Sequence, residues 1–377
     1  MHSKNKKNKL LNKTSISNKS IFYVVGVMSG TSLDGIDLCY VRFEQAESWK
    51  FKIIDAKTVG YPKEWQELLQ NAISYSSSKL AQINKDYTYF LSKVISDFVK
   101  QYPETTIDAI CSHGHTIYHQ PNLGRTLQIG NLPILSNYLN QMVVCDFRTQ
   151  DIRLGGQGAP LVPIGDVLLF PQYDYCINLG GFANISYRKN LERIAFDICP
   201  VNIIMNHYTK TIGLPYDSEG NVALKGTICF PLLDELNSLN FYASPYPKSL
   251  GLEWVQENIY PIIDSYELSV YCILRTVVEH CAFQISNVIK GSNLKNGLFT
   301  GGGVYNTFLI NRIQSLSNQE ILKASAEIIE FKEALIFGFL GVLKLKEIPN
   351  CLSSVTGASY DHASGCVYFP KNNINST

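Results

Sequence analysis

The alternation of apolar and polar positions predicts strands that end in polar, glycine-containing turns. Segments 21–28 (IFYVVGVM) and 36–43 (IDLCYVRF) are rich in β-branched and aromatic residues, a composition typical of strands. Between them, residues 29–35 carry two glycines, three hydroxyl groups and an aspartate. We therefore expect a β-hairpin, whose turn is either a plain tight reversal or a ligand-binding loop.

The same pattern returns twice. Residues 175–188 (YCINLGGFANISYR) again place a glycine turn between two strand-like segments. Residues 298–314 (LFTGGGVYNTFLINRIQ) place three glycines between a short strand and a helix, where backbone N–H groups and the helix dipole favour an anionic ligand. Two hairpins of one type predict two related lobes, each presenting backbone N–H groups to one shared ligand.

Helical spacing of apolar residues appears between positions 63 and 101, and a further helix is predicted at 330–345. The apolar positions of the first stretch are Trp65, Leu68, Leu69, Ile73, Leu91, Val94, Ile95 and Phe98. Short strands are predicted at 108–114 and 142–147, each ending in polar residues where the cleft of an α/β protein would open. Strands and helices together predict an α/β fold.

Length and composition indicate a globular protein of two domains. The chain has 377 residues, of which 45% are apolar and 17% charged, and one core rarely serves so long a chain. We expect residues 1–20 to be a disordered lysine-rich tail. Residues 21–150, completed by 351–377, are predicted to form the first lobe, and residues 151–350 the second.

The distribution of charge disfavours a nucleic-acid partner. The net charge is +1, but six lysines and no acid lie in residues 1–20, so the remaining chain is net acidic. The basic tail and apolar segment 21–28 imitate a signal peptide, yet no small-residue cleavage pattern follows. No apolar run approaches the roughly 20 residues of a membrane helix. We expect a soluble, cytoplasmic protein without membrane contact.

Ten cysteines occur singly within apolar segments, and no Cys-x-x-Cys pair is present. Zinc ligation usually requires clustered ligands in the sequence. We therefore predict reduced, mostly buried thiols. His113, His115 and His119 have neither metal-ligand spacing nor an evident acidic partner, so a structural or substrate-lining role is predicted for them.

Seven motifs in order resemble the anhydro-N-acetylmuramic acid kinase family, over about residues 23–370. They are GVMSGTSLDGID, SHGHTIYHQP, TLQIG, DFRTQDIRLGGQGAPLVP, NLGGFANIS, TGGGVYN and SVTGAS. The resemblance implies two lobes of the actin-like ATPase (ribonuclease H-like) type, with ATP bound in the cleft between them. It also implies a homodimer that converts ATP, water and 1,6-anhydro-N-acetylmuramic acid to N-acetylmuramic acid 6-phosphate and ADP, in peptidoglycan recycling.

The resemblance assigns nucleotide-binding roles to the three glycine turns. It implies that the first hairpin turn cradles the phosphates, with Asp34 holding Mg²⁺ through water. Gly180 and Gly181 would approach from the other lobe, and Gly301, Gly302 and Gly303 would lie against the adenosine. The residues predicted for the first turn are Gly30, Thr31, Ser32, Leu33, Asp34, Gly35, Ile36 and Asp37.

By resemblance, Asp197 is the catalytic base that activates water for attack on the anomeric carbon. The departing O6 is itself the phosphoryl acceptor, so we hypothesise that phosphate and Mg²⁺ replace the second carboxyl of an ordinary glycoside hydrolase. The alternative is a carboxylate that caps the following helix.

Three further residues are candidate substrate contacts. Arg148 suits the lactyl carboxylate or a sugar oxygen, although a salt bridge to Asp146 or Asp151 is an equal alternative. Glu333 matches a family glutamate that would accept hydrogen bonds from the sugar, and its alternative is an exposed helical charge. Asn202 matches the asparagine of the family motif, and the resemblance implies that it contacts the substrate.

The chain departs from its relatives in two places. Residues 197–202 read DICPVN where many relatives have Asp-Thr-Gly-Pro-Gly-Asn, which puts backbone contacts at Cys199 and Val201 in doubt. Leu250 and Leu252 replace a threonine and an arginine, so no substrate contact is predicted from residues 248–253. A kinase of the same fold for another sugar or a small acid is the alternative function, and a non-enzymatic ATPase module of the superfamily is the other.

Overall fold

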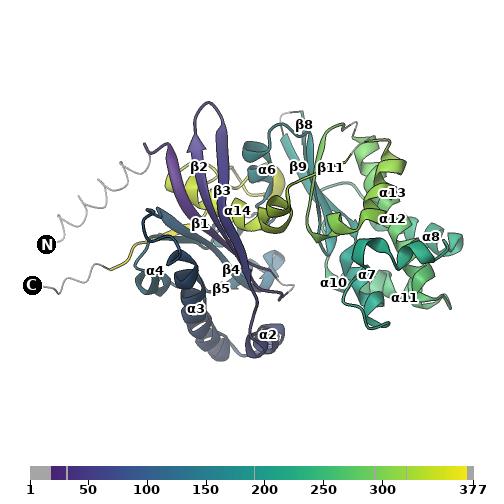
Figure 1. The fold of residues 1–377 in the computed structure, drawn as a ribbon, viewed down its shortest axis with the longest axis horizontal. Helices are drawn as coiled ribbons and strands as arrows, with labels where there is room; N and C mark the ends of the chain where they lie inside the picture. Colours follow the sequence, from purple (N-terminus) through teal and green to yellow (C-terminus); the bar gives the residue numbers. More distant parts are fainter. Residues whose placement is uncertain (1–17, 31–32, 191, 293, 320, 372–377) are drawn as a thin grey trace, which may run out of the picture. The chain divides into compact units, whose positions relative to one another are not determined.

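The computed structural model describes residues 18–30, 33–190, 192–292, 294–319 and 321–371. The chain divides into two compact units (Figure 1): unit 1 comprises Met1–Phe170 with Phe331–Thr377, and unit 2 comprises Pro171–Glu330. The predicted boundaries between the lobes lie at 150/151 and 350/351, whereas the two units divide at 170/171 and 330/331. Most of the tail predicted at 1–20 lies outside the described residues, and in the part that is described Lys19 forms an ion pair with Asp108.

Unit 1 is built on a seven-stranded sheet. Its strands are β1 (Ile21–Ser29), β2 (Ile36–Gln45), β3 (Trp49–Val59), β4 (Ala109–Gln120), β5 (Arg125–Ile129), β6 (Val143–Cys145) and β12 (Cys366–Tyr368). Its helices are α2 (Lys63–Gln70), α3 (Ser77–Val99), α4 (Ile134–Leu139), α5 (Thr149–Arg153), α6 (Pro163–Leu169), the greater part of α14 (Ala326–Leu345), α15 (Ser353–Thr356) and the 3₁₀ turns η1 (Ala72–Ser74) and η2 (Pro121–Leu123).

Unit 2 is built on a five-stranded sheet. Its strands are β7 (Tyr175–Leu179), β8 (Phe182–Lys189), β9 (Glu192–Pro200), β10 (Gly297–Thr300) and β11 (Leu322–Lys323). Its helices are α7 (Asn202–Lys210), α8 (Phe230–Asn237), α9 (Asn240–Ala243), α10 (Leu252–Asn258), α11 (Tyr260–Asp264), α12 (Val270–Gly291), α13 (Thr307–Ser317) and the 3₁₀ turns η3 (Ser218–Gly220), η4 (Ala223–Lys225) and η5 (Gly302–Tyr305).

The two sheets share one strand order. Unit 1 reads β12-β6-β4-β1-β2-β3, with β5 paired to β4, and unit 2 reads β11-β10-β7-β8-β9. In each unit the first strand pairs antiparallel with the second and parallel with the fourth. This repeat confirms the predicted α/β class with two related lobes of the ribonuclease H-like type, and both predicted hairpins are present.

The sheet of unit 1 is covered on both faces. One face packs on α3: Val25, Leu38 and Ile110 share a buried cluster with Leu91 and Ile95. Figure 1 shows α3 beside this sheet. Ile73 is 69% exposed, so its predicted place on the apolar helical face is wrong, because α2 ends at Gln70 and a 3₁₀ turn follows.

The other face of this sheet packs closely on α14. A Cβ on Gly26 would overlap the carbonyl oxygen of Ala334, and a Cβ on Gly341 would overlap the Cys111 side chain. The backbones of β1 and α14 therefore approach directly. This packing places most of α14 in unit 1, which explains why the second boundary falls at Glu330 rather than at residue 350.

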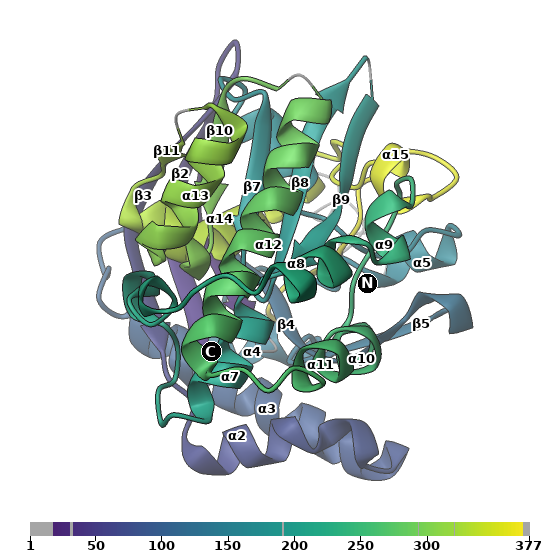
Figure 2. The ribbon, with the colours of Figure 1, turned by 90° about the vertical axis from the view of Figure 1, so that its right-hand side faces the viewer.

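In unit 2, α12 and α13 cross a face of the sheet (Figure 2). The buried side chains of both helices join those of β7 and β9 in one cluster. Among the described residues, no helix is both long and apolar enough to cross a membrane.

We expect Gly26→Ala to destabilise unit 1 strongly. The added methyl group must push α14 away from β1, since the colliding atom is a backbone carbonyl, and overpacking of this kind costs about 3 kcal/mol. A thermal melt should show a clear fall in melting temperature. Gly291→Ala is the matched control, because a Cβ there meets nothing within 4 Å. Equal melting temperatures for the two variants would contradict the close approach.

Candidate functional site

The first turn, residues 30–35, joins β1 to β2 in unit 1. Leu33 has a left-handed φ of 59°, and its N–H donates to Gly30 O at 3.4 Å. A Cβ on Gly35 would lie 2.7 Å from both Thr58 Cγ2 and Val59 O, so only glycine fits where β3 passes. Thr31 and Ser32, predicted phosphate contacts, lie outside the described residues.

A buried chain of hydrogen bonds fixes the start of this turn. Ser29 Oγ lies 2.6 Å from the hydroxyl of Tyr61 and 2.8 Å from His115 Nδ1, and Tyr61 in turn bonds to Tyr87. Burial lowers the pKa of His115 to about 4, so its ring is neutral at physiological pH. His115 therefore has the structural role predicted as one of its two alternatives.

Three carboxylates of unit 1 interact electrostatically near the first turn. Asp34 is exposed, Asp37 accepts a 2.6 Å hydrogen bond from Thr58 Oγ1, and Glu333 lies on α14. The pKa of Glu333 is raised, mainly by loss of hydration and further by Asp37 and Asp34, while Arg148 opposes the rise. The Glu333 side chain nevertheless keeps exposed surface. Glu333 is therefore an exposed helical charge, as its alternative expects, and it interacts electrostatically with Asp34, Asp37 and Arg148. Its contact with the sugar stays a prediction.

These carboxylates fit a magnesium ion chemically. Mg²⁺ prefers carboxylate and water oxygens. Burial is the main cause of the raised pKa of Glu333, and the repulsion by Asp37 and Asp34 that adds to it would be relieved by a divalent cation. The predicted role of Asp34 in holding Mg²⁺ through water stays a prediction.

Arg148 is held by neutral partners just before α5. Its Nε donates to His113 Nε2 at 2.9 Å and its Nη1 to Gly158 O at 2.8 Å. Neither Asp146 nor Asp151, both in the described part of the chain, forms an ion pair with it, so that alternative is wrong. Burial, followed by the charge of Arg148, lowers the pKa of His113 well below its usual value. A neutral His113 therefore positions a guanidinium that keeps further N–H donors for a ligand.

The second turn, Gly180–Gly181, connects β7 to β8 in unit 2 and is tied to the start of α7. Val201 N–H donates to Gly181 O at 2.8 Å, and Asn202 N–H to Gly180 O at 3.3 Å. The Asn202 side chain donates to Leu179 O at 3.3 Å. Its predicted contact with substrate is untested, and the structure gives it a part in holding the turn.

The third turn, Gly301–Gly303, packs directly on the end of β7. Gly301 has a φ of 83°, and a Cβ there would lie 2.6 Å from Asn178 Oδ1. A Cβ on Gly303 would lie 2.8 Å from Leu179 Cβ, whereas one on Gly302 would meet nothing within 4 Å. The third turn follows β10 and leads through η5 into α13, as the sequence predicts. Unit 2 therefore brings its two predicted nucleotide-binding turns together.

Asp197 lies within β9, beside a bulge in the pairing of β8 with β9. Its Oδ2 accepts a 2.8 Å hydrogen bond from Leu250 N–H, and its own N–H donates to Lys248 O at 3.1 Å. The alternative role as a helix cap is wrong, because α7 begins at Asn202 and its N-cap residue is Val201. Burial raises the pKa of Asp197 to about 6, and the Leu250 hydrogen bond limits the rise.

The sequence pattern did not predict the Leu250 N–H group as a partner of Asp197. Residues 248–253 depart from the family pattern, and no contact was predicted from them. The interaction uses the backbone N–H of Leu250, which any residue except proline supplies. Side-chain identity therefore carried no signal of it.

Comparison with known proteins identifies the family. The family model described as anhydro-N-acetylmuramic acid kinase matches residues 22–370. The chain belongs to this family. Proteins named anhydro-N-acetylmuramic acid kinase from Bacillus cereus (strain Q1) and Bacillus thuringiensis (strain Al Hakam) are each 32% identical to it. The alignments cover 92% and 93% of this chain and 99% of each relative.

Membership of this family establishes the general activity of the chain. The chain is a kinase that uses ATP and a hydroxyl group of a small sugar as acceptor. A xylulose kinase from Lactobacillus acidophilus is structurally similar at a TM-score of 0.44 and 12% identity, covering 93% of this chain and 94% of that one. This similarity is too low to add to the topology described above.

Proposed function

We propose that the chain hydrolytically opens 1,6-anhydro-N-acetylmuramic acid and phosphorylates O6, giving N-acetylmuramic acid 6-phosphate and ADP. The observation that carries the ring-opening step is the Asp197 carboxyl, which is half-buried, held by Leu250 N–H and has a pKa raised to about 6. Such a carboxylate is ionised at neutral pH and basic enough to take a proton from water. We further propose a cytoplasmic role in cell-wall recycling, as a homodimer.

The proposed reaction balances without a second catalytic carboxyl. Asp197 takes a proton from the attacking water, whose oxygen bonds to the anomeric carbon while the bond from that carbon to O6 breaks. O6 then bonds to the γ-phosphorus as the bond to the ADP oxygen breaks. Asp197 finally releases its proton to solvent. Since O6 receives the phosphoryl group, it needs no proton from the protein.

The glycine turns are proposed to bind the nucleotide. Backbone N–H groups of the first turn and of Gly180–Gly181 would bind phosphate oxygens. The third turn would lie against the adenosine, where the open space at Gly302 allows close approach. Asp34 would hold Mg²⁺ through water, and the ion would neutralise phosphate charge. Arg148 and Glu333 would bind the sugar.

Incubation with the anhydro sugar and ATP in ¹⁸O-labelled water tests this proposal. The product should carry the label on its anomeric oxygen and none in its phosphate. Unlabelled product incubated in labelled water without enzyme measures spontaneous exchange. Equal ATP consumption with and without the anhydro sugar would reject the proposal. Phosphorylation of an ordinary hexose but not of the anhydro sugar would favour a kinase for another sugar.

We expect kcat to depend on the ionisation of Asp197. Its pKa is raised to about 6, so the reactive carboxylate is lost as the pH falls through that value. The rate should be level above pH 7 and fall about tenfold per pH unit well below pH 6. Initial rates at saturating ATP and sugar would be compared with ATP affinity at each pH, because the nucleotide also titrates. A rate that stays level down to pH 4 would exclude Asp197 as the base.

A further inference from the structure

Three potential metal ligands meet in the interior of unit 1, apart from the glycine turns. Asp151 lies on α5, Cys351 lies just before α15, and His362 follows α15. Their exposed fractions are 0%, 2% and 5%. A carboxylate oxygen, a thiol sulfur and a ring nitrogen of the three lie within 4.8 Å of one another. The proposed reaction uses none of these groups.

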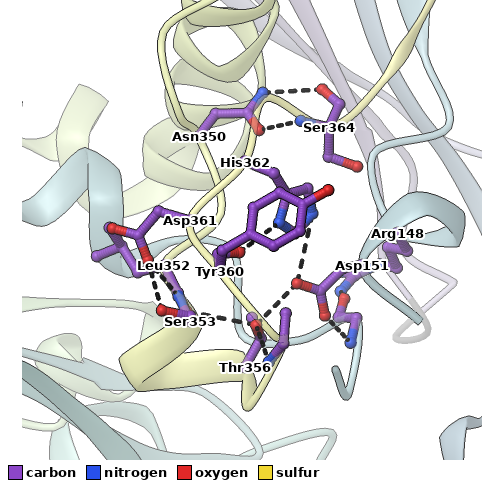
Figure 3. Close-up of polar contacts among 12 residues, drawn as sticks. Arg148, Asp151, Asn350, Leu352, Ser353, Thr356, Tyr360, Asp361, His362 and Ser364 are labelled. Carbon is purple, nitrogen blue, oxygen red and sulfur yellow. Dashed lines mark hydrogen bonds and ion pairs between the residues drawn. The ribbon is translucent and has the colours of Figure 1, made fainter. Parts of the chain in front are cut away.

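The hydrogen bonding of His362 prepares one ring nitrogen for a ligand. Nδ1 lies 3.1 Å from Tyr360 O and can only donate to that carbonyl. In a neutral ring, Nε2 then carries a lone pair. Nε2 is buried and has no hydrogen-bond partner among the described residues. It faces Asp151 Oδ1 (Figure 3), so a cation between these two atoms would be within reach of both.

The spacing of these two atoms suits a shared cation better than a direct bond. Nε2 and Oδ1 are 3.6 Å apart. A charge-assisted hydrogen bond between a protonated ring and a carboxylate would be about 2.8 Å long. Two ligands at about 2.05 Å from one tetrahedral zinc ion are about 3.4 Å apart. The observed distance lies close to the second value.

The Asp151 carboxylate is oriented by further donors. Gly158 N–H donates to Oδ2 at 2.7 Å. Thr356 Oγ1 donates to Oδ1, also at 2.7 Å (Figure 3). Metal-binding carboxylates and histidines are commonly held by such outer hydrogen bonds. Both Asp151 and His362 have them here, so two of the three groups are already fixed in place.

We propose that Asp151, Cys351 and His362 bind a zinc ion. Sulfur, nitrogen and oxygen ligands together favour zinc over magnesium or calcium. Zinc with one thiolate and one carboxylate is electrically neutral, which suits a buried site. A water molecule or a protein group would complete four-coordination.

The zinc ion would join α5 to the C-terminal segment. Cys351 and His362 already pair across an antiparallel bridge, with N···O distances of 3.0 and 3.2 Å. Asp151 connects this bridge to Gly158, whose carbonyl accepts from Arg148. The ion would thus stabilise the backbone that holds Arg148, without taking part in phosphoryl transfer.

Metal analysis of the full chain, purified without a histidine tag, tests the proposal. After dialysis against Zn²⁺ and then against metal-free buffer, the protein should retain about one zinc per chain. Cys351→Ser should lose it. Cys366→Ser is the matched control, since Cys366 is a half-buried thiol of the same unit outside the cluster, and it should retain the zinc. A chelator should lower the melting temperature of the wild type but not of Cys351→Ser.

Cobalt substitution covers the case in which Cys351→Ser fails to fold. Co²⁺ bound by the wild type should give the near-ultraviolet absorption of a thiolate–cobalt bond and the visible bands of a tetrahedral ion. Absence of zinc and of these bands in the wild type would overturn the proposal and leave an Asp151–His362 ion pair. Equal zinc content in a folded Cys351→Ser protein would overturn it as well.

Discussion

Replacing Asp197 with asparagine is expected to lower kcat by about 10³-fold or more while ATP still binds. Asparagine has nearly the same shape, and its side-chain oxygen can still accept the hydrogen bond from Leu250 N–H. It cannot take a proton from water, so ring opening and phosphorylation should be lost together. Steady-state rates with the anhydro sugar and calorimetric ATP binding measure the two effects separately.

The same substitution should not destabilise the fold at neutral pH. The pKa of Asp197 rises from 3.8 to about 6 on folding, so the charged form is disfavoured in the native state. Stability therefore falls as the pH rises from about 4 to 6, and asparagine avoids this loss. The gain above pH 6 is at most about 3 kcal/mol, and less because the group is partly hydrated.

Asp174→Asn is the matched control for Asp197→Asn. Asp174 lies in the same unit, and its carboxylate also accepts from backbone N–H groups, those of Lys295 and Asn296. It lies outside the predicted site and should keep wild-type kcat. Near-normal turnover by Asp197→Asn would remove Asp197 from the role of base, and an equal loss in both variants would make the effect a structural one.

The local pattern of the sequence was sufficient to predict the hairpins and the glycine turns. Strand β1, the Gly30 turn and β2 follow from alternating β-branched residues interrupted by glycine. The third turn follows equally from a short strand, three glycines and a helical pattern. These features depend on neighbours within about ten residues, so they can be read without the fold.

Contacts between distant segments could not be predicted in this way. The contact of Asp197 with Leu250 and the cluster of Asp151, Cys351 and His362 join residues that are far apart in the chain. Isolated cysteines were predicted to be buried, reduced thiols, which agrees with the free and mostly buried cysteines of the structure. Only the fold brings Cys351 close to other possible ligands.

The unit boundary shows a similar dependence on tertiary packing. The helical pattern of α14 was recognised, but not the sheet against which it packs. The packing of α14 on this sheet depends on Gly26, which lets the backbones of β1 and α14 approach, and on Gly341, which leaves room for the Cys111 side chain. A glycine in a strand or helix pattern signals such contact but does not name its partner.

Replacing Glu333 with glutamine is expected to lower kcat/KM for the sugar by about 10- to 100-fold, with ATP affinity unchanged. In the proposed complex, Glu333 accepts hydrogen bonds from sugar hydroxyls, and a charged acceptor contributes about 1.5–3 kcal/mol. Glutamine keeps the size of the side chain but removes the charge.

The separation of KM from kcat distinguishes binding from a general structural effect. We expect most of the loss in KM for the sugar, since Glu333 takes no proton in the proposed reaction. Glu327→Gln is the matched control, because Glu327 is an exposed glutamate in the first turn of the same helix and should behave as wild type. Wild-type kinetic constants for Glu333→Gln would leave the carboxyl without a role in sugar binding. A loss confined to kcat would instead assign it to the chemical step, where a proton or a developing positive charge must be stabilised.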